Sequence, residues 1–208
     1  GISALYFLTR NPRVKLYLFE PVPRNIDRLK NNLKGFENRY ELQEFAIGVE
    51  EGQFDFACDE TGRYGGLIKG GASYLAQWDP GKTIQVEVVL ANEALKKILS
   101  LHESIDILKI DIEGDEYKII DDLLIHCEQI SQIIIEFHDV HKKKEEFFIN
   151  VKKLQKFFTI VHLHANNYNH YNDDGFPINV EITLCKIKYI TDSKIRSFNF
   201  PIKNLDYP

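Results

Sequence analysis

The sequence predicts an α/β fold with a mostly parallel sheet and an antiparallel edge at its C-terminal end. Short runs of β-branched and apolar residues alternate with segments whose apolar residues recur at helical spacing, the pattern of strands joined by crossover helices. The run Ile105–Ile112 is rich in isoleucine, as expected for a strand covered on both faces. The last two predicted strands, Ile160–His164 and Val180–Lys186, have no helix between them and should therefore pair antiparallel.

Three helices are predicted in the first half of the chain. Ile2–Leu8 is apolar and should end before Asn11-Pro12, because the residue before a proline disfavours helical geometry. Pro23–Leu33 begins on a proline, which the first turn of a helix accepts. Asn92–Leu101 begins on an asparagine, a good helix cap.

The strands of this half combine apolar runs with alternating apolar and polar residues, and the first two end close to a proline or a glycine. They are Val14–Phe19, Tyr40–Ile47 and Thr83–Leu90. Gln53–Ala57 and a partner near Gly66–Lys69 are expected to form a hairpin in a glycine-rich region.

The second half centres on the strand that begins at Ile105, a turn at Gly114 and a helix over Tyr117–Ile125. A further strand, an amphipathic helix and the two final strands follow. The strand and the helix are Ile130–Phe137 and Glu145–Phe158. Residues 190–208 form an irregular tail, and no linker or repeat divides the chain, so we predict one domain over residues 1–208.

Composition excludes several classes of protein. The chain has 208 residues, 44% of them hydrophobic and 27% charged, with a net charge of −5. These values suit a globular domain without a basic nucleic-acid footprint, and no apolar run reaches the roughly 18 residues that a membrane span needs. The three cysteines are far apart and odd in number, so we expect reduced thiols and a cytoplasmic protein. The oligomeric state stays open.

Three carboxylates, Asp111, Glu113 and Glu116, lie just after the central strand, where open α/β sheets bind ligands. Their mutual repulsion raises pKa values or requires a compensating cation, so a functional site is one interpretation. The structural alternative is that one carboxylate caps the following helix and the others are solvated.

Other strand ends also carry polar residues. Glu20 ends the first strand, where a carboxylate can accept both hydroxyl hydrogens of a ribose, although many strands simply end in Glu. The small residues at Ala46–Gly48 allow a flat ring to lie against the backbone, or form a plain turn. Glu136 and His138 lie at the end of another strand and His164 ends the next, so both histidines are candidates for a site.

Several of these segments, in this order, resemble the FkbM family of S-adenosylmethionine-dependent methyltransferases. They are Y-L-F-E-P (17–21), F-A-I-G (45–48), D-I-L-K-I-D-I-E-G-D-E (106–116) and I-I-I-E-F-H (133–138). The resemblance implies a Rossmann-like methyltransferase fold with a seven-stranded sheet, and methyl transfer to a hydroxyl of a sugar, glycolipid or related metabolite. The partner it implies is a small-molecule or glycan acceptor.

The resemblance also implies roles for individual residues. Glu20, followed by Pro21, would hold the ribose of the methyl donor, and the backbone at Ala46 and Ile47 would flank the adenine. Asp111 and Glu113 would face the methionine end of the donor and the acceptor.

The family's glycine-rich donor loop, D-x-G-x-N-x-G, should lie immediately before Ile2, with Gly1 as its last glycine. The chain contains no Met and begins inside a predicted helix. We therefore expect a fragment whose first strand and donor loop are missing, and which binds the donor poorly. Restoring the preceding residues should then raise thermal stability.

Methyl transfer to a hydroxyl needs a base for the hydroxyl proton. The candidates are His138 first, because histidine has the ordinary pKa nearest neutrality, then His164, then Asp111 or Glu113. The prediction includes no metal ion. In a variant hypothesis, these two carboxylates bind Mg²⁺ or Mn²⁺ together with Glu136 and His138.

Two other functions stay open. One is a glycoside hydrolase using paired carboxylates, which leaves Glu20 unexplained. The other is a catalytically inactive binding module that keeps the methyltransferase sheet. A dinucleotide dehydrogenase lacks support because no G-x-G-x-x-G is present.

The acceptor pocket would be shaped by loops whose aromatic residues suit either sugar stacking or ordinary packing. These aromatics are Tyr64, Tyr74, Trp78, Tyr168 and Tyr171.

Overall fold

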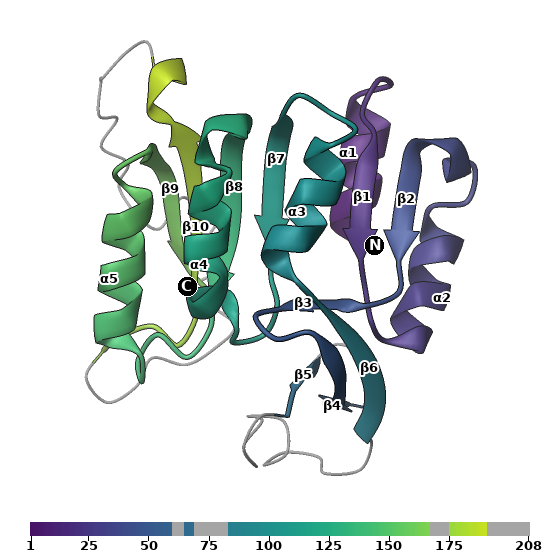
Figure 1. Ribbon diagram of the computed structural model, residues 1–208, viewed down its shortest axis with the longest axis horizontal. Helices are drawn as coiled ribbons and strands as arrows, with labels where there is room; N and C mark the ends of the chain where they lie inside the picture. The colour runs from purple at the N-terminus through teal and green to yellow at the C-terminus, as the bar shows by residue number, and fades with distance from the viewer. Residues whose placement is uncertain (60–64, 69–82, 167–174, 191–208) are drawn as a thin grey trace. The chain divides into compact units, whose positions relative to one another are not determined.

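A computed structural model describes residues 1–59, 65–68, 83–166 and 175–190 (Figure 1). The chain divides into two compact units, Gly1–Ile98 and Leu99–Pro208, and each is described by itself. The single-domain prediction stays a prediction. The tail from residue 191 and the five loop aromatics proposed for sugar stacking lie outside the described residues.

The first unit opens with a two-stranded parallel sheet and two helices. These elements are α1 (Ile2–Arg10), β1 (Leu16–Phe19), α2 (Pro23–Asn32) and β2 (Tyr40–Gln43), with the short 3-10 helix η1 (Glu37–Arg39) before β2. β1 and β2 pair from Leu16 opposite Tyr40 to Phe19 opposite Gln43. Apolar residues at helical spacing, Leu8 on α1 and Leu29 on α2 among them, bury the helices against this pair.

A second sheet in this unit has the strand order β3-β6-β4-β5. Its strands are β3 (Ala46–Gly48), β4 (Gly52–Cys58), β5 (Gly65–Leu67) and β6 (Thr83–Leu90), and α3 (Ala91–Leu99) follows. The predicted hairpin is confirmed, because Phe56 of β4 pairs antiparallel with Leu67 of β5. Gly48 is required in β3, since a Cβ there would lie 2.8 Å from a methyl of Val88.

The prediction of one strand over Tyr40–Ile47 is wrong. The segment forms two strands, because β2 pairs with β1 whereas β3 pairs with β6 in a different sheet. The chain must turn between the two pairings, and it does so at Glu44 and Phe45.

The second unit holds a four-stranded sheet with the order β7-β8-β10-β9 (Figure 1). Its strands are β7 (Ile105–Ile110), β8 (Ile130–Phe137), β9 (Phe158–Ala165) and β10 (Val180–Lys186). The helices are α4 (Glu116–Ile125) and α5 (Lys144–Leu154), with short 3-10 helices η3 (Cys127–Gln129) and η4 (Ile187–Tyr189). β7 and β8 are parallel, and β10 is antiparallel to both of its neighbours, which confirms the predicted antiparallel edge.

A mostly parallel sheet is not confirmed. Among the described strands, three pairs are parallel and four are antiparallel. The expectation that the central strand is covered on both faces is also wrong. β7 is an edge strand of its sheet, and the Ile107 side chain is 38% exposed, whereas Ile110 is buried.

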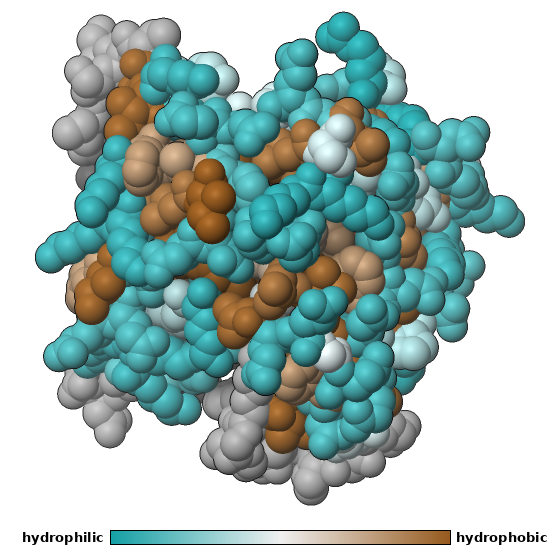
Figure 2. Space-filling model, viewed as in Figure 1, coloured by the Kyte–Doolittle hydropathy of each residue, from teal (hydrophilic) through white to brown (hydrophobic). Residues whose placement is uncertain are grey.

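The helix expected over Glu145–Phe158 ends at Leu154, because Phe158 already begins β9 and is almost fully buried in the sheet. None of the three cysteines forms a disulfide. The face in Figure 2 is mainly hydrophilic, with smaller hydrophobic patches between. Within the described ranges, no helix combines the length and apolar character needed to cross a membrane.

Candidate functional site

The site is built on the turn between β7 and α4. The backbone of Glu113 has φ +56° and that of Gly114 has φ +116°, so the chain reverses within two residues. Glu116, the first residue of α4, is fully buried. Its carboxylate accepts hydrogen bonds from the backbone N–H of Ile112 at 3.2 Å and of Gly114 at 3.1 Å. One of the three carboxylates therefore stabilises the turn before α4. The structural alternative had one of them cap this helix, whereas the N-cap residue Asp115 makes no side-chain capping hydrogen bond.

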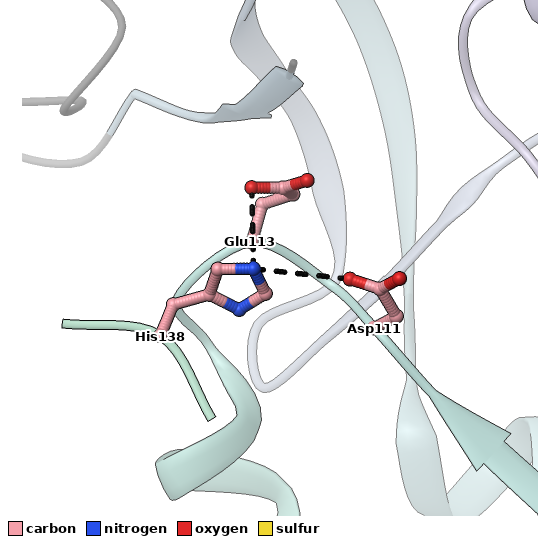
Figure 3. A group of neighbouring side chains, drawn as sticks. All are labelled: Asp111, Glu113 and His138. Atoms are coloured by element: carbon pink, nitrogen blue, oxygen red, sulfur yellow. Dashed lines mark ion pairs between the residues drawn. The ribbon is translucent and has the colours of Figure 1, made fainter. Parts of the chain in front are cut away.

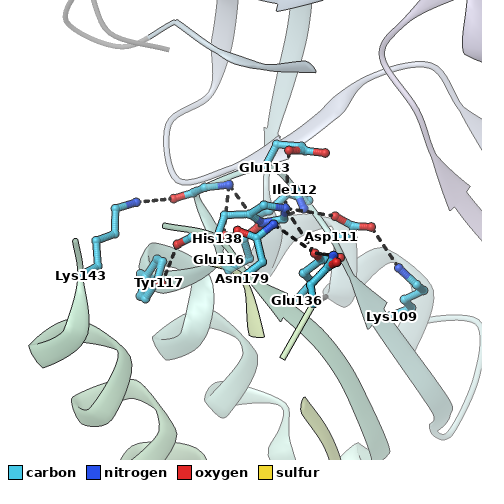
Figure 4. Close-up of polar contacts among 12 residues, drawn as sticks. Lys109, Asp111, Ile112, Glu113, Glu116, Tyr117, Glu136, His138, Lys143 and Asn179 are labelled. Carbon is cyan, nitrogen blue, oxygen red and sulfur yellow. Dashed lines mark hydrogen bonds and ion pairs between the residues drawn. The ribbon is translucent and has the colours of Figure 1, made fainter. Parts of the chain in front are cut away.

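The same carboxylate holds a histidine from the next strand. Oε1 of Glu116 lies 2.8 Å from Nδ1 of His138, which directly follows β8 and is 13% exposed. The Tyr117 hydroxyl donates to the backbone carbonyl of His138 at 2.7 Å. Nζ of Lys143 donates to the carbonyl of Gly114 at 3.1 Å (Figure 4). Both the ring and the backbone of His138 are thus fixed.

The other ring nitrogen of His138 faces three more carboxylates. Nε2 lies 3.5 Å from Glu113, 3.9 Å from Asp111 and 3.9 Å from Glu136 (Figures 3 and 4). All three distances exceed an ordinary N–H···O hydrogen bond. Four carboxylates, two from the turn after β7, one from α4 and one from β8, therefore surround one imidazole.

Two amides and a lysine hold the outer carboxylates in place. Glu136 accepts from the side-chain amides of Asn166 at 3.1 Å and Asn179 at 3.3 Å. Asp111 lies 3.2 Å from Nζ of Lys109. Asn179 precedes β10 and Asn166 follows β9, so the antiparallel edge brings both amides to the end of β8.

The surroundings shift two pKa values in the cluster. Burial disfavours the imidazolium of His138, but the hydrogen bond to Glu116 and the charges of Glu116, Glu113 and Glu136 outweigh it and raise the pKa to about 9. Partial burial, with smaller contributions from the neighbouring carboxylates, raises the pKa of Glu113 to about 7 against the opposing effect of His138. Of these two groups, the Glu113 carboxyl and not the His138 imidazole therefore has the pKa nearest neutrality.

His164 lies further along the same sheet. It pairs with Glu181 of β10, which in turn pairs with Glu136 of β8, so β10 separates His164 from β8. Adjacent strands are about 4.8 Å apart, which places His164 roughly 10 Å from Glu136 along this row. Asp111, Glu113 and His138 are brought together as the sequence predicted, whereas His164 stands apart.

Residues 2–169 match the family described as the methyltransferase FkbM domain. The chain belongs to the FkbM methyltransferase family. The matched FkbM region contains the turn after β7, the whole of α4 and β8, and His138, but ends before Asn179. Among proteins with curated functions, none matches this chain significantly.

The residues that the FkbM resemblance assigned to the ribose, the adenine and the glycine-rich loop of the donor site lie in the first unit, whereas Asp111 belongs to the second. The Glu20 carboxylate accepts from the backbone N–H of Val22 at 3.0 Å, and burial raises its pKa. Gly1 is the N-cap residue of α1. Ala46 packs with Val22 in the core of the second sheet, and Ile47 follows it in β3.

The same cluster has the chemistry to hold a metal ion. Asp111, Glu113 and His138 each present one ligand atom, and these atoms lie within 4.8 Å of one another (Figure 3). Hard oxygen ligands with one imidazole suit Mg²⁺ or Mn²⁺. A protonated His138 is the alternative cation for the same carboxylates, and it competes with a metal for Nε2.

Sequence reasoning missed the residues that support His138. Tyr117 and Lys143 fix its backbone and the turn, and Asn166 and Asn179 orient Glu136. Two of them carried a signal in the sequence. Asn166 shortly follows the predicted strand Ile160–His164, and Asn179 immediately precedes the predicted strand Val180–Lys186, whose first residue pairs with Phe137 at the end of β8.

Proposed function

We propose that this FkbM-family protein is an S-adenosylmethionine-dependent O-methyltransferase acting on a hydroxyl of a sugar, glycolipid or related metabolite. The observation that carries the proposal is the set of carboxylates around His138, at the carboxyl ends of β7 and β8, in a chain of a methyltransferase family. Negative charge there favours a positively charged donor by Coulomb attraction. The free cysteines suit a reducing, cytoplasmic setting.

The donor residues of the proposal are Glu20 with Pro21, Ala46 and Ile47, together with Gly1 and Asp111. Glu20 fits the role of a ribose ligand, because its carboxylate is half-buried and its bond to the N–H of Val22 fixes its orientation. One of its oxygens accepts that bond, and carboxylate oxygens have lone pairs to accept further hydroxyl hydrogens. Asp111 is 38% exposed and so accessible to a ligand.

When bound, S-adenosylmethionine supplies a methyl group on a sulfonium. This methyl group would pass to the acceptor oxygen, and the electron pair of the carbon–sulfur bond would stay on sulfur. The chain's own residues position the acceptor and take the hydroxyl proton. We assign the proton to the pair of Glu113 and His138, whose carboxylate and Nε2 lie 3.5 Å apart. Glu113 is the accessible member, with 36% of its side chain exposed.

Calorimetric titration with S-adenosylhomocysteine tests the donor half of the proposal. The protein should be expressed with whatever residues flank this sequence naturally. We expect binding, a loss of at least tenfold in affinity for Glu20→Ala, and no change for Glu44→Ala, whose carboxylate is 55% exposed and paired with Lys30. Absence of binding by the wild type would overturn the proposal in favour of an inactive module with a methyltransferase fold.

A second measurement tests the chemistry. Release of S-adenosylhomocysteine is followed in the presence of a panel of neutral sugars and glycolipids. Turnover that depends on one acceptor and is lost in Glu113→Gln supports O-methylation, whereas turnover unaffected by Glu113→Gln removes this residue from the mechanism.

A further inference from the structure

We propose that Glu116 is a positioning residue: it fixes His138 as the tautomer with its proton on Nδ1, so that Nε2 is the nitrogen presented to the reacting groups. The effect of Glu116 on catalysis rests on the proposed methyl transfer, whereas the assignment of the His138 tautomer does not. The inference concerns a residue that touches neither the proposed donor nor the acceptor, because its side chain is fully buried.

The hydrogen-bond partners of Glu116 dictate the tautomer. An ionised carboxylate is an acceptor only, so each polar group in contact with it must donate. The N–H groups of Ile112 and Gly114 are two such donors, at 3.1–3.2 Å, and Nδ1 of His138 at 2.8 Å is the third. Nδ1 therefore carries a hydrogen whether the imidazole is neutral or charged.

Capping of the turn alone does not account for a carboxylate at this position. The two backbone N–H groups are neutral donors, which a neutral amide or hydroxyl could satisfy without the cost of burying a charge. The carboxylate at position 116 gains a charge-assisted bond to the imidazole and lies in the first turn of α4, where the helix dipole favours negative charge. The bond to the His138 imidazole, rather than the contacts with the turn, therefore explains why residue 116 is a glutamate.

The second nitrogen then has a defined environment. Nε2 faces Asp111 and Glu113 from the turn after β7 and Glu136 from β8, all at 3.5–3.9 Å (Figure 4). From the other packed elements, the Tyr117 hydroxyl and the Lys143 ammonium point at backbone carbonyls. Nε2 is thus the ring nitrogen that can exchange a proton with Glu113 or an acceptor.

Histidine ¹⁵N chemical shifts test the tautomer directly. The protein is labelled with ¹⁵N-histidine, and the spectrum of His138→Gln identifies the resonances of His138. Over a titration from pH 6 to 10.5, we expect the neutral form of wild-type His138 to show a protonated Nδ1 and an unprotonated Nε2. A protonated Nε2 in the neutral form would overturn the proposal, and this measurement needs no variant at Glu116.

Two variants distinguish the effect of the Glu116 hydrogen bond on His138 from the effect of a nearby negative charge. Glu113→Gln removes a carboxylate 3.5 Å from Nε2, and we expect it to lower the pKa of His138 while the proton stays on Nδ1. Glu116→Gln should lower the same pKa by about 1–3 units and allow both tautomers, because a side-chain amide can also donate. Glu116→Asp is the control for misfolding in Glu116→Gln, because it also changes the side chain at this position but keeps its negative charge. An unchanged tautomer and pKa in folded Glu116→Gln would contradict the inference.

The catalytic consequence has its own readout. In the transfer assay, Glu116→Gln should lower kcat at least tenfold with little change in the donor KM, and should shift the pH profile in the direction of the His138 pKa. If the wild type transfers no methyl group, the proposed function fails while the NMR result still decides the role of Glu116. If the wild type is active and Glu116→Gln keeps its kcat and pH profile, the positioning role is wrong.

Discussion

The Tyr117 hydroxyl donates a 2.7 Å hydrogen bond to the backbone carbonyl of His138, which joins the first turn of α4 to the residue that follows β8 (Figure 4). Burial of this phenol raises its pKa, so it remains a donor throughout the working range of the protein. Lys143 makes the matching bond from the start of α5 to Gly114. The two turns that carry the site are therefore connected through their backbones as well as through Glu116.

Replacing Tyr117 by Phe should lower the free energy of unfolding by about 1–3 kcal/mol, because it leaves the His138 carbonyl without its partner. Urea denaturation measures the change. Tyr6→Phe is the control, since Tyr6 is 56% exposed and its loss of a hydroxyl should change stability by less than about 0.5 kcal/mol. Equal effects of the two substitutions would show that the Tyr117 bond adds nothing.

Stability should fall as pH rises above neutrality because of His138. Its pKa is about 9 in the folded protein against the ordinary 6.5, so its stabilising effect is complete below pH 6.5 and disappears as pH rises to 9. The raised pKa of Glu113 acts in the same direction between pH 4.5 and 7. Thermal unfolding of the wild type should show the decline between pH 6.5 and 9, and His138→Gln should remove most of it.

The exposed His162 of β9 gives the control for this pH dependence. His162→Gln should keep the decline of the wild type over the same pH interval. A wild-type stability that is constant from pH 6.5 to 9 would contradict the raised pKa of His138.

Apart from the backbone pairing of its sheets, Arg39 should contribute more to the stability of the first unit than any other polar side chain that the structure describes there. Its guanidinium donates to the carbonyls of Leu8 at 3.1 Å, Val14 at 3.3 Å and Asn11, and so holds the end of α1 and the chain before β1. Arg39→Met should cost roughly 2–3 kcal/mol of unfolding free energy, because hydrogen bonds to a charged group are lost.

Arg39→Lys should recover only part of that loss, since one ammonium cannot reproduce the planar fork of a guanidinium. Arg13→Met, at an exposed position, should be nearly neutral. A full recovery of the unfolding free energy by Arg39→Lys would mean that the positive charge, and not the geometry of the hydrogen bonds to the three carbonyls, stabilises this unit.

Removal of divalent metal ions should leave methyl transfer unchanged, because a protonated His138 already compensates the carboxylates of the cluster. The assay is repeated after EDTA treatment and buffer exchange, with and without added Mg²⁺ or Mn²⁺. Turnover that is lost on chelation and restored by one of these ions would instead make Asp111, Glu113 and His138 a metal site.

Most of the elements could be predicted because their signals are local. The bounds of β6, β8 and β10 agree with the sequence prediction, since alternating or continuous apolar runs between polar turns define them. The division of Tyr40–Ile47 into β2 and β3 could not be predicted, because no proline or glycine interrupts the segment and only the pairing partners of its two halves differ. The exposure of Ile107 likewise depends on the place of β7 in its sheet, which a single strand's composition does not contain.

The sequence by itself determined the order of helices and strands, the presence of three carboxylates after β7 and a histidine after β8, and the resemblance to the FkbM family. These properties depend on residue type and spacing along the chain. Only the tertiary structure decided that Glu116 is the buried partner of Nδ1 and that Glu113, not His138, titrates near neutrality. Hydrogen bonds and pKa values depend on burial and on distances between residues far apart in sequence, and folding alone sets both.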